Sequence, residues 1–248
     1  MIYISSSFFK FNKLKLMLNF FLDNNISNLE LSYFKYENNI SKQLQNYSNK
    51  FNFLIHNYFP PPQKEFVFNL ASNNKKIQNE SIKHAKKAIR LSSKLKSKYY
   101  SFHAGFLIDP KIDQLGKKIK SKRINNKNQS LKFFIDNVNQ LSNFAKKEGI
   151  ILLIENNVIS KENYDYYKSN PFLMCDLEDC IYIMNNTPNN VNLLIDVGHL
   201  NVSARTLKFN KYNFLQKCKK WIKAYHLSNN NGFDDQNALI TEKSWFWN

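Results

Sequence analysis

The sequence predicts an α/β protein folded as a (β/α) barrel, and three observations support this fold class. Seven short apolar segments that can form strands alternate with segments of helical periodicity. The strand segments are almost continuously apolar, as in a parallel sheet that helices cover on its faces. The length of 248 residues is ordinary for one barrel, so we expect a single domain over residues 1–248.

The strand candidates follow one another in a regular order. They are Ile2–Ser6, Ser27–Ser32 (which carries Glu30), Phe51–His56, Tyr99–His103, Ile150–Ile154, Val191–Ile195 and Trp221–His226. Helices are expected at Leu14–Leu22, Glu80–Lys96, Leu131–Lys147, Asp176–Met184 and Phe214–Lys219, a long mobile connection at Lys111–Lys127, and a loop after residue 228. Gly198 is expected to allow a sharp turn after its strand. No eighth strand can be found, so the barrel is expected to lack it or to be truncated before it.

Composition excludes several classes of protein. The start of the chain, Met1–Ile4, has neither a basic region nor a cleavage site of a signal peptide, and no apolar run is long enough to span a membrane. The three cysteines lack metal-type spacing, which favours buried thiols in a reducing, cytoplasmic compartment. Glycine is too scarce for a Rossmann fingerprint, and no P-loop is present, which argues against nucleotide cofactors.

The net charge of +17 favours anionic substrates, but it is weak evidence for nucleic-acid binding. All but three of the basic residues are lysines, and they are scattered over the expected helices, where they form solvated faces. We therefore expect no membrane partner, and nucleic acid remains only an alternative.

Polar side chains gather where the expected strands end. Of the five histidines, His56, His103, His199 and His226 fall at or just beyond such an end, and Glu155 and Asp196 do the same on two further strands. Because the carboxyl ends of barrel strands converge on one mouth, these groups predict a divalent-metal site for Zn, Mn, Co or Mg. Each residue also has a simpler explanation: Asp196 or Glu155 as a helix cap, His56 and His103 as packed rim residues.

The same residues carry a resemblance to the xylose isomerase-like TIM barrels, which include sugar-phosphate isomerases, epimerases and AP endonucleases. It rests on Ile55–Tyr58, Phe102–Gly105, Leu153–Asn156, Ile195–His199 and Tyr225–Gly232. The resemblance implies that Glu155, Asp196 and His226 bind metal, with His56, His103 and Asp235 as further candidate ligands. It also implies that His199 contacts substrate, as in the epimerases, or binds a further metal, as in the endonucleases. The epimerases use a second glutamate, from the eighth strand, that this sequence does not match.

These observations predict a metal-dependent isomerase or epimerase of a sugar or sugar phosphate, acting by proton removal next to a carbonyl. Glu155 is the expected base, His199 orients a hydroxyl, and Arg205 and Asn156 are candidate substrate contacts. One alternative is a metal-dependent phosphodiesterase on abasic DNA, although Asn237 stands where those enzymes have a histidine. Another is an impaired barrel that only binds metal or sugar. The unpaired barrel edge favours a homodimer.

Overall fold

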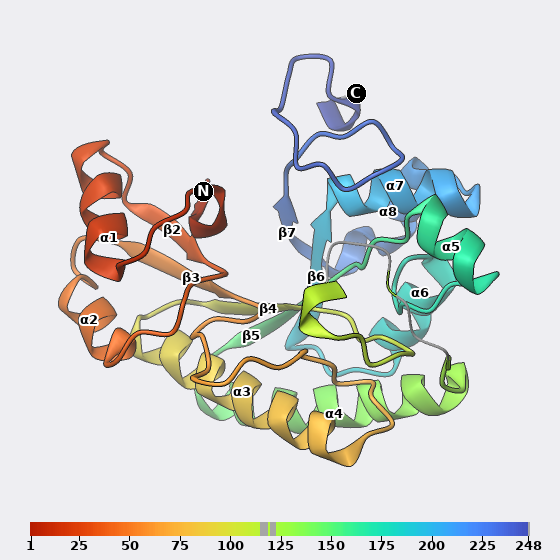
Figure 1. Ribbon diagram of the computed structural model, residues 1–248, viewed down its shortest axis with the longest axis horizontal. Coiled ribbons are helices and arrows are strands. Elements are labelled where there is room, and N and C mark those ends of the chain that lie inside the picture. The colour runs from red at the N-terminus through yellow and green to blue at the C-terminus, as the bar shows by residue number, and fades with distance from the viewer. Residues whose placement is uncertain (115–118, 120–122, 248) are drawn as a thin grey trace.

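The structure, a computed structural model, describes residues 1–114, 119 and 123–247, and a parallel sheet forms its centre (Figure 1). Seven strands pair in chain order, each one parallel to the next. They are β1 (Ile4–Ser5), β2 (Asn28–Leu31), β3 (Asn52–His56), β4 (Tyr99–His103), β5 (Ile151–Glu155), β6 (Val191–Asp196) and β7 (Ile222–His226). All seven expected strands are therefore present, and their ends differ from the expected ones by at most two residues.

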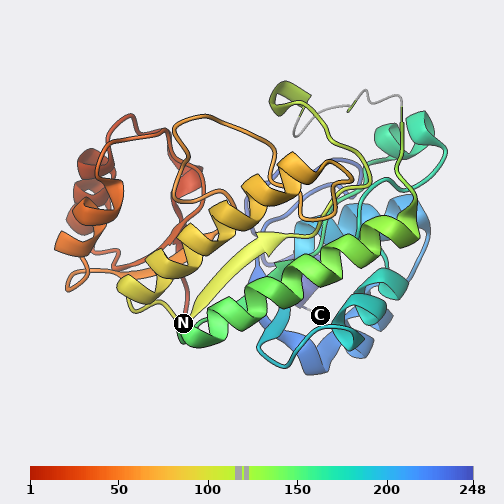
Figure 2. The ribbon, with the colours of Figure 1, turned by 90° about the horizontal axis from the view of Figure 1, so that it is seen from below.

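Helices connect the strands and cover the outer face of the sheet. They are α1 (Leu14–Asp23), α2 (Ile40–Asn46), α3 (Lys75–Lys94), α4 (Lys127–Lys147), α5 (Lys161–Tyr167), α6 (Leu177–Asn185), α7 (Val197–Leu207) and α8 (Lys211–Cys218). Short 3-10 turns are η1 (Ser6–Phe8), η2 (Ile112–Gln114), η3 (Lys219–Trp221) and η4 (Trp245–Trp247). Helices α3 and α4 run side by side beneath the sheet (Figure 2).

The core lies between this sheet and its helices, as the apolar strands predict. All six residues of β6 are buried, whereas β7, at the edge, alternates between partly exposed and exposed positions. The largest fully buried side chains include Tyr100 and Phe102 of β4 and Phe134 of α4. Continuous burial of central strands is the pattern that parallel sheets require.

The sheet is a curled half-barrel that is open on one side. Its two edges are β1 and β7, and in the described part of the chain no strand joins them. Figure 1 shows the sheet rising at both sides, toward β2 on the left and β7 on the right. The predicted (β/α) barrel architecture is confirmed, and residues 1–114, 119 and 123–247 contain no eighth strand of this sheet.

Three helices were not predicted, and one expected turn is wrong. Helices α2, α5 and α7 occupy segments without an assigned helix, and Gly198 lies inside α7 rather than in a sharp turn. Helix α7 begins directly after β6 because the Asp196 side chain accepts a hydrogen bond from the His199 backbone N–H (2.9 Å) and so caps the first turn. Glycine is needed here for space: a Cβ at position 198 would lie 2.5 Å from Ser228 Oγ.

The expected long connection over residues 111–127 is only partly described. It contains η2 and the start of α4, while residues 115–118 and 120–122 lie outside the described residues. The three cysteines are free and buried, as expected. Within the described chain, no helix combines the length and the apolar character that crossing a membrane requires.

Candidate metal centre

The strand order and register bring the predicted polar residues together at one mouth. Parallel strands that pair in sequence order present their carboxyl ends on the same side. In the register, His103 lies beside Glu155 on neighbouring strands, and Asp196 lies beside His226. The strand register therefore confirms the expectation that the strand ends converge.

Glu155 lies at the centre of the cluster, with its side chain 1% exposed. Its Oε1 atom is 3.0 Å from Nδ1 of His226. Its Oε2 atom is 3.3 Å from Nε2 of His56 and 3.4 Å from Nδ1 of His103. Burial raises the pKa of Glu155, but the surrounding histidines lower it more, to well below the ordinary value. Glu155 is therefore an ionised carboxylate without access to bulk water.

The Oε2 atom of Glu155 is buried and has no hydrogen bond, although two imidazole nitrogens lie close to it. Ser101 Oγ contacts the other nitrogen of His56, Nδ1, at 2.9 Å. Burial lowers the pKa of His56 to about 4 and also lowers that of His103. Both rings are thus neutral near pH 7, which is the form that ligates metals.

Asp196 and His226 form the other side of the cluster. The Asp196 Oδ2 atom is 3.9 Å from His226 Nδ1, and one donor atom each from Glu155, Asp196 and His226 lie within 4.8 Å of one another. Burial raises the pKa of Asp196. For His226, burial lowers the pKa, but Glu30 and Glu155 raise it more, to well above the ordinary value. Asp196 Oδ2 therefore faces the cluster, while Oδ1 of the same side chain caps α7.

His199 stands in the first turn of α7 and is held from two sides. Its Nδ1 donates to the backbone carbonyl of Asn156 (2.8 Å), and its Nε2 lies 3.3 Å from Asp235 Oδ2. Burial lowers the pKa of His199, but Asp196, Asp235 and Glu155 raise it to about 10. The ring is therefore positively charged at neutral pH.

Two of the predicted substrate contacts have other partners. The Asn156 side chain accepts a hydrogen bond from the Asp196 backbone N–H (2.8 Å) and donates one to the Asp196 carbonyl (3.2 Å). It therefore fixes the backbone at the end of β6. Arg205 is exposed, and its guanidinium lies 3.6 Å from the ring centroid of Phe233. Arg205 is not brought into the histidine cluster, and its substrate role stays a prediction.

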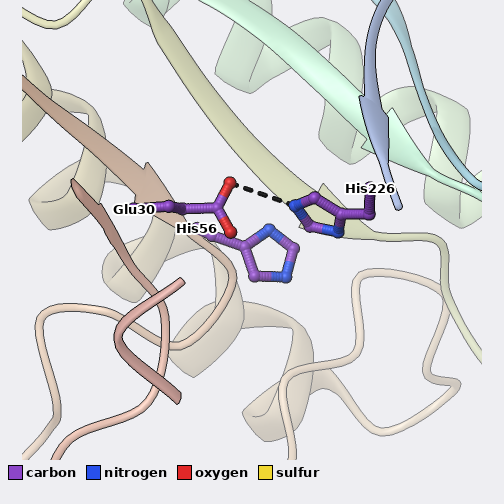
Figure 3. Close-up of side chains that lie close together, drawn as sticks. All are labelled: Glu30, His56 and His226. Carbon is purple, nitrogen blue, oxygen red and sulfur yellow. Dashed lines mark hydrogen bonds and ion pairs between the residues drawn. The ribbon is translucent and has the colours of Figure 1, made fainter. Parts of the chain in front are cut away.

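Glu30 is a member of the cluster to which the sequence assigned no role. It lies on β2 with its side chain 7% exposed, and its Oε2 atom is 3.0 Å from Nε2 of His226 (Figure 3). The available signal was a single carboxylate between two leucines of the strand, Leu29 and Leu31. That signal could not reveal the partner, which lies 196 residues further along the chain.

The donors fit a divalent metal. Carboxylate oxygens and imidazole nitrogens are the ligands that zinc, manganese and cobalt accept. Three overlapping groups place one donor atom per residue within 4.8 Å of each other: Glu155, Asp196 and His226; His56, His103 and Glu155; and Glu30, His56 and His226. The first group is the one that the sequence predicts most directly.

A basic groove lies elsewhere on the molecule and contains none of these residues. It has a volume of about 500 Å³ and runs along α3 and α4, where Lys75, Lys83, Lys86, Lys87 and Arg90 line it. These cations are on the outer helices, as expected for solvated faces. The groove is therefore separate from the chemistry at the mouth of the barrel.

Comparison with known proteins agrees with this fold. The sequence matches the family model described as xylose isomerase-like TIM barrel over residues 20–242. A search among curated proteins finds no match. The fold and the donor cluster define a (β/α) barrel with a metal-competent mouth, and the chain belongs to the xylose isomerase-like TIM barrel family.

Solved structures share this fold at low sequence identity. A D-tagatose 3-epimerase-like protein is 18% identical, with a TM-score of 0.73, and the match covers 98% of this chain and 82% of that one. A candidate xylose isomerase from Rhodospirillum rubrum is 13% identical, with a TM-score of 0.69 and coverage of 97% and 82%. A D-psicose 3-epimerase from Clostridium cellulolyticum, solved with D-tagatose, is 11% identical, with a TM-score of 0.64 and coverage of 91% and 72%.

Proposed function

We propose that this protein is a divalent-metal-dependent isomerase or epimerase of a sugar or sugar phosphate. The observation that carries the proposal is the convergence of Glu155, Asp196 and His226 at the ends of three consecutive strands. The epimerases among the structural neighbours support the sugar class. The reaction is the removal of a proton from a carbon next to a carbonyl and its return at the same carbon or a neighbouring one.

Glu155, Asp196 and His226 would hold the metal. The metal would supply an electrophile that polarises the substrate carbonyl. Glu155 is the proposed base, and its Oε2 atom, which has no hydrogen bond, is the oxygen available to accept the proton. Oε1 of the same carboxylate faces His226, so the two oxygens have separate tasks.

His199 is the proposed orienting group for a substrate hydroxyl. Its charge is fixed by the Asn156 carbonyl on one nitrogen and by Asp235 on the other. The Asp235 contact, at 3.3 Å, is longer than the usual distance of a charge-assisted hydrogen bond, and a substrate hydroxyl would take the place beside Nε2. The basic character of the chain favours a phosphorylated sugar.

A second candidate function, a metal-dependent phosphodiesterase, is favoured by one specific feature. His56, His103 and Oε2 of Glu155 form a further donor group next to the first. In that case Oε2 binds a second cation and is not a base. The two functions therefore assign the same oxygen to different tasks, and the number of cations per chain separates them.

The test is solvent exchange at the substrate carbon. The protein is incubated with Mn²⁺ or Co²⁺ in D₂O with a panel of ketoses and ketose phosphates that includes D-tagatose. We expect nuclear magnetic resonance to show deuterium entering next to the carbonyl, and Glu155→Gln to slow this by about 100-fold or more. Glu80→Gln, which makes the same change on the exposed face of α3, should leave the rate unchanged.

Three other results would contradict the proposal. Exchange that persists in Glu155→Gln would remove Glu155 as the base. Cleavage of an abasic DNA duplex with two cations per chain would favour the phosphodiesterase, and its binding should weaken steeply with salt. A bound cation without exchange or cleavage would favour the alternative of a barrel that only binds.

A further inference from the structure

The His226 ring lies between two carboxylates, one on each ring nitrogen. Nδ1 is 3.0 Å from Glu155 Oε1, and Nε2 is 3.0 Å from Glu30 Oε2. Figure 3 shows Glu30 pointing from β2 toward His226, with His56 next to both. The ring is therefore fixed in orientation by groups from β2 and β5, on opposite sides of its own strand end.

The two nitrogens cannot serve the same purpose. Nδ1 faces both Glu155 and Asp196, so it is the atom that would ligate a cation together with them. A neutral imidazole that ligates through Nδ1 carries its proton on Nε2. That proton points at Glu30, whose carboxylate can only accept. Glu30 therefore lies on the wrong side of the ring to bind the same cation.

We propose that Glu30 is a positioning residue, which holds His226 in the tautomer and orientation of an Nδ1 metal ligand. The inference rests on the proposed metal site of Glu155, Asp196 and His226. Such a carboxylate behind a ligating histidine fixes the ring and increases its basicity. The side chain of Glu30 is 7% exposed, so its hydrogen bond is shielded from competition with water.

The position of Glu30 in the fold explains why this contact matters here. β7 is an edge strand, and in the described residues it has no paired neighbour on its outer side. Glu30 reaches His226 from β2, across the open side of the half-barrel. The contact thus supplies an anchor on the side where β7 has no strand beside it.

A competing arrangement places a cation among Glu30, His56 and His226 through Nε2. It would require His226 to give up its Nδ1 role or to lose both ring protons. It would also draw His56 away from its present contacts, since its Nδ1 lies by Ser101 and its Nε2 by Glu155. The geometry therefore favours Glu30 as the partner of the ligand.

The experiment is a Co²⁺ titration of the metal-free protein. Calorimetry measures the affinity and the number of bound ions, and the absorption spectrum of the bound ion reports its coordination. The variants are Glu30→Ala and Glu30→Gln. The control is Glu80→Gln, which makes the same change from carboxylate to amide on an exposed helix face. Asp196→Asn serves as the reference for loss of the site. Circular dichroism at each step verifies that the variants are folded.

We expect Glu30→Ala to weaken Co²⁺ binding by about 10- to 100-fold and to alter the spectrum, with the number of bound ions unchanged. Glu30→Gln should fall between wild type and Glu30→Ala, because its amide oxygen still accepts the Nε2 proton but carries no charge. It also keeps the test valid if Glu30→Ala does not fold. Glu80→Gln should bind as wild type does.

Two results would overturn the inference while leaving the proposed function intact. Unchanged affinity in a folded Glu30→Ala would show that His226 needs no such anchor. Loss of one of two ions, with unchanged affinity for the other, would make Glu30 a ligand. By contrast, a wild type that binds no Co²⁺, or equal binding by Asp196→Asn, would overturn the metal site itself and the inference with it.

Discussion

Each oxygen of Glu155 faces imidazole nitrogens: Oε1 faces His226, and Oε2 faces His56 and His103. One carboxylate therefore connects two donor groups that the backbone holds on neighbouring strands. The sequence indicates that these groups lie together, because a carboxylate and histidines at the ends of barrel strands meet at one mouth. Oε2 can accept a proton if one cation binds per chain, whereas it binds a cation itself if two do. The residue types alone do not determine the number of cations.

Glu30 shows the limit of reasoning from sequence at the residue scale. A glutamate inside a strand is compatible with a surface position, and only the tertiary structure shows that it is buried. Its partner is the last residue of β7, which it meets through the curl of the sheet and not through strand pairing. No local pattern encodes such a contact.

His84 gives a pH prediction outside the cluster. It is buried among Tyr58, Phe66 and Phe68, and burial lowers its pKa to about 4. The unfolded chain therefore takes up this proton first as the pH falls below the ordinary value near 6.5. Stability linked to His84 is complete above that value and is lost as the pH falls toward 4.

The measurement is urea unfolding of wild type and His84→Phe at pH 7 and pH 5. Between these values the free energy of unfolding of wild type should fall by about 2 kcal/mol more than that of the variant. Phenylalanine keeps an aromatic ring among the other aromatic residues, so a large loss at pH 7 is not expected. Equal pH dependence of the two proteins would contradict the assignment.

Helix α7 shows at the scale of an element how one residue serves structure and site together. Asp196 ends β6, caps α7 and offers its second oxygen to the donor group with His226. The geometry therefore confirms the explanation of Asp196 as a helix cap, and its role as a metal ligand stays a prediction. The helix was missed because its sequence contains glycine and few strong helix formers, whereas packing of Val197 and Leu200 stabilises it.

Gly198→Ala tests this close packing. The new Cβ would lie 2.5 Å from Ser228 Oγ, 3.0 Å from Asn230 Nδ2 and 3.1 Å from Asp196 Oδ1. We expect the free energy of unfolding to fall by about 1–3 kcal/mol, and the affinity for metal to fall as Asp196 and the loop after β7 separate.

Gly149→Ala is the matched control for that variant. It has a φ of +72° and open space around it, so alanine there adds backbone strain of about 1–2 kcal/mol without a clash. Its metal affinity should equal that of wild type. If Gly198→Ala also binds metal as wild type does, the packing of α7 does not set the geometry of the site.

At the scale of the whole molecule, the strands were predictable from the sequence and the short helices were not. Each strand is a short apolar run with its own polar end, so seven strands and their order follow from local sequence. Helices α2 and α5 have only seven residues each and depend on tertiary packing, which local periodicity does not reveal. The homodimer expected from the unpaired edge remains a prediction.

The most direct test of the account is the metal content of the purified protein. Elemental analysis should compare wild type with Glu155→Gln and Asp196→Asn. The second variant keeps a capping oxygen for α7, so its fold should be preserved. We predict about one Mn, Co, Mg or Zn ion per wild-type chain after reconstitution, and its loss in both variants. A wild type without metal, or variants that retain it fully, would contradict the proposed centre.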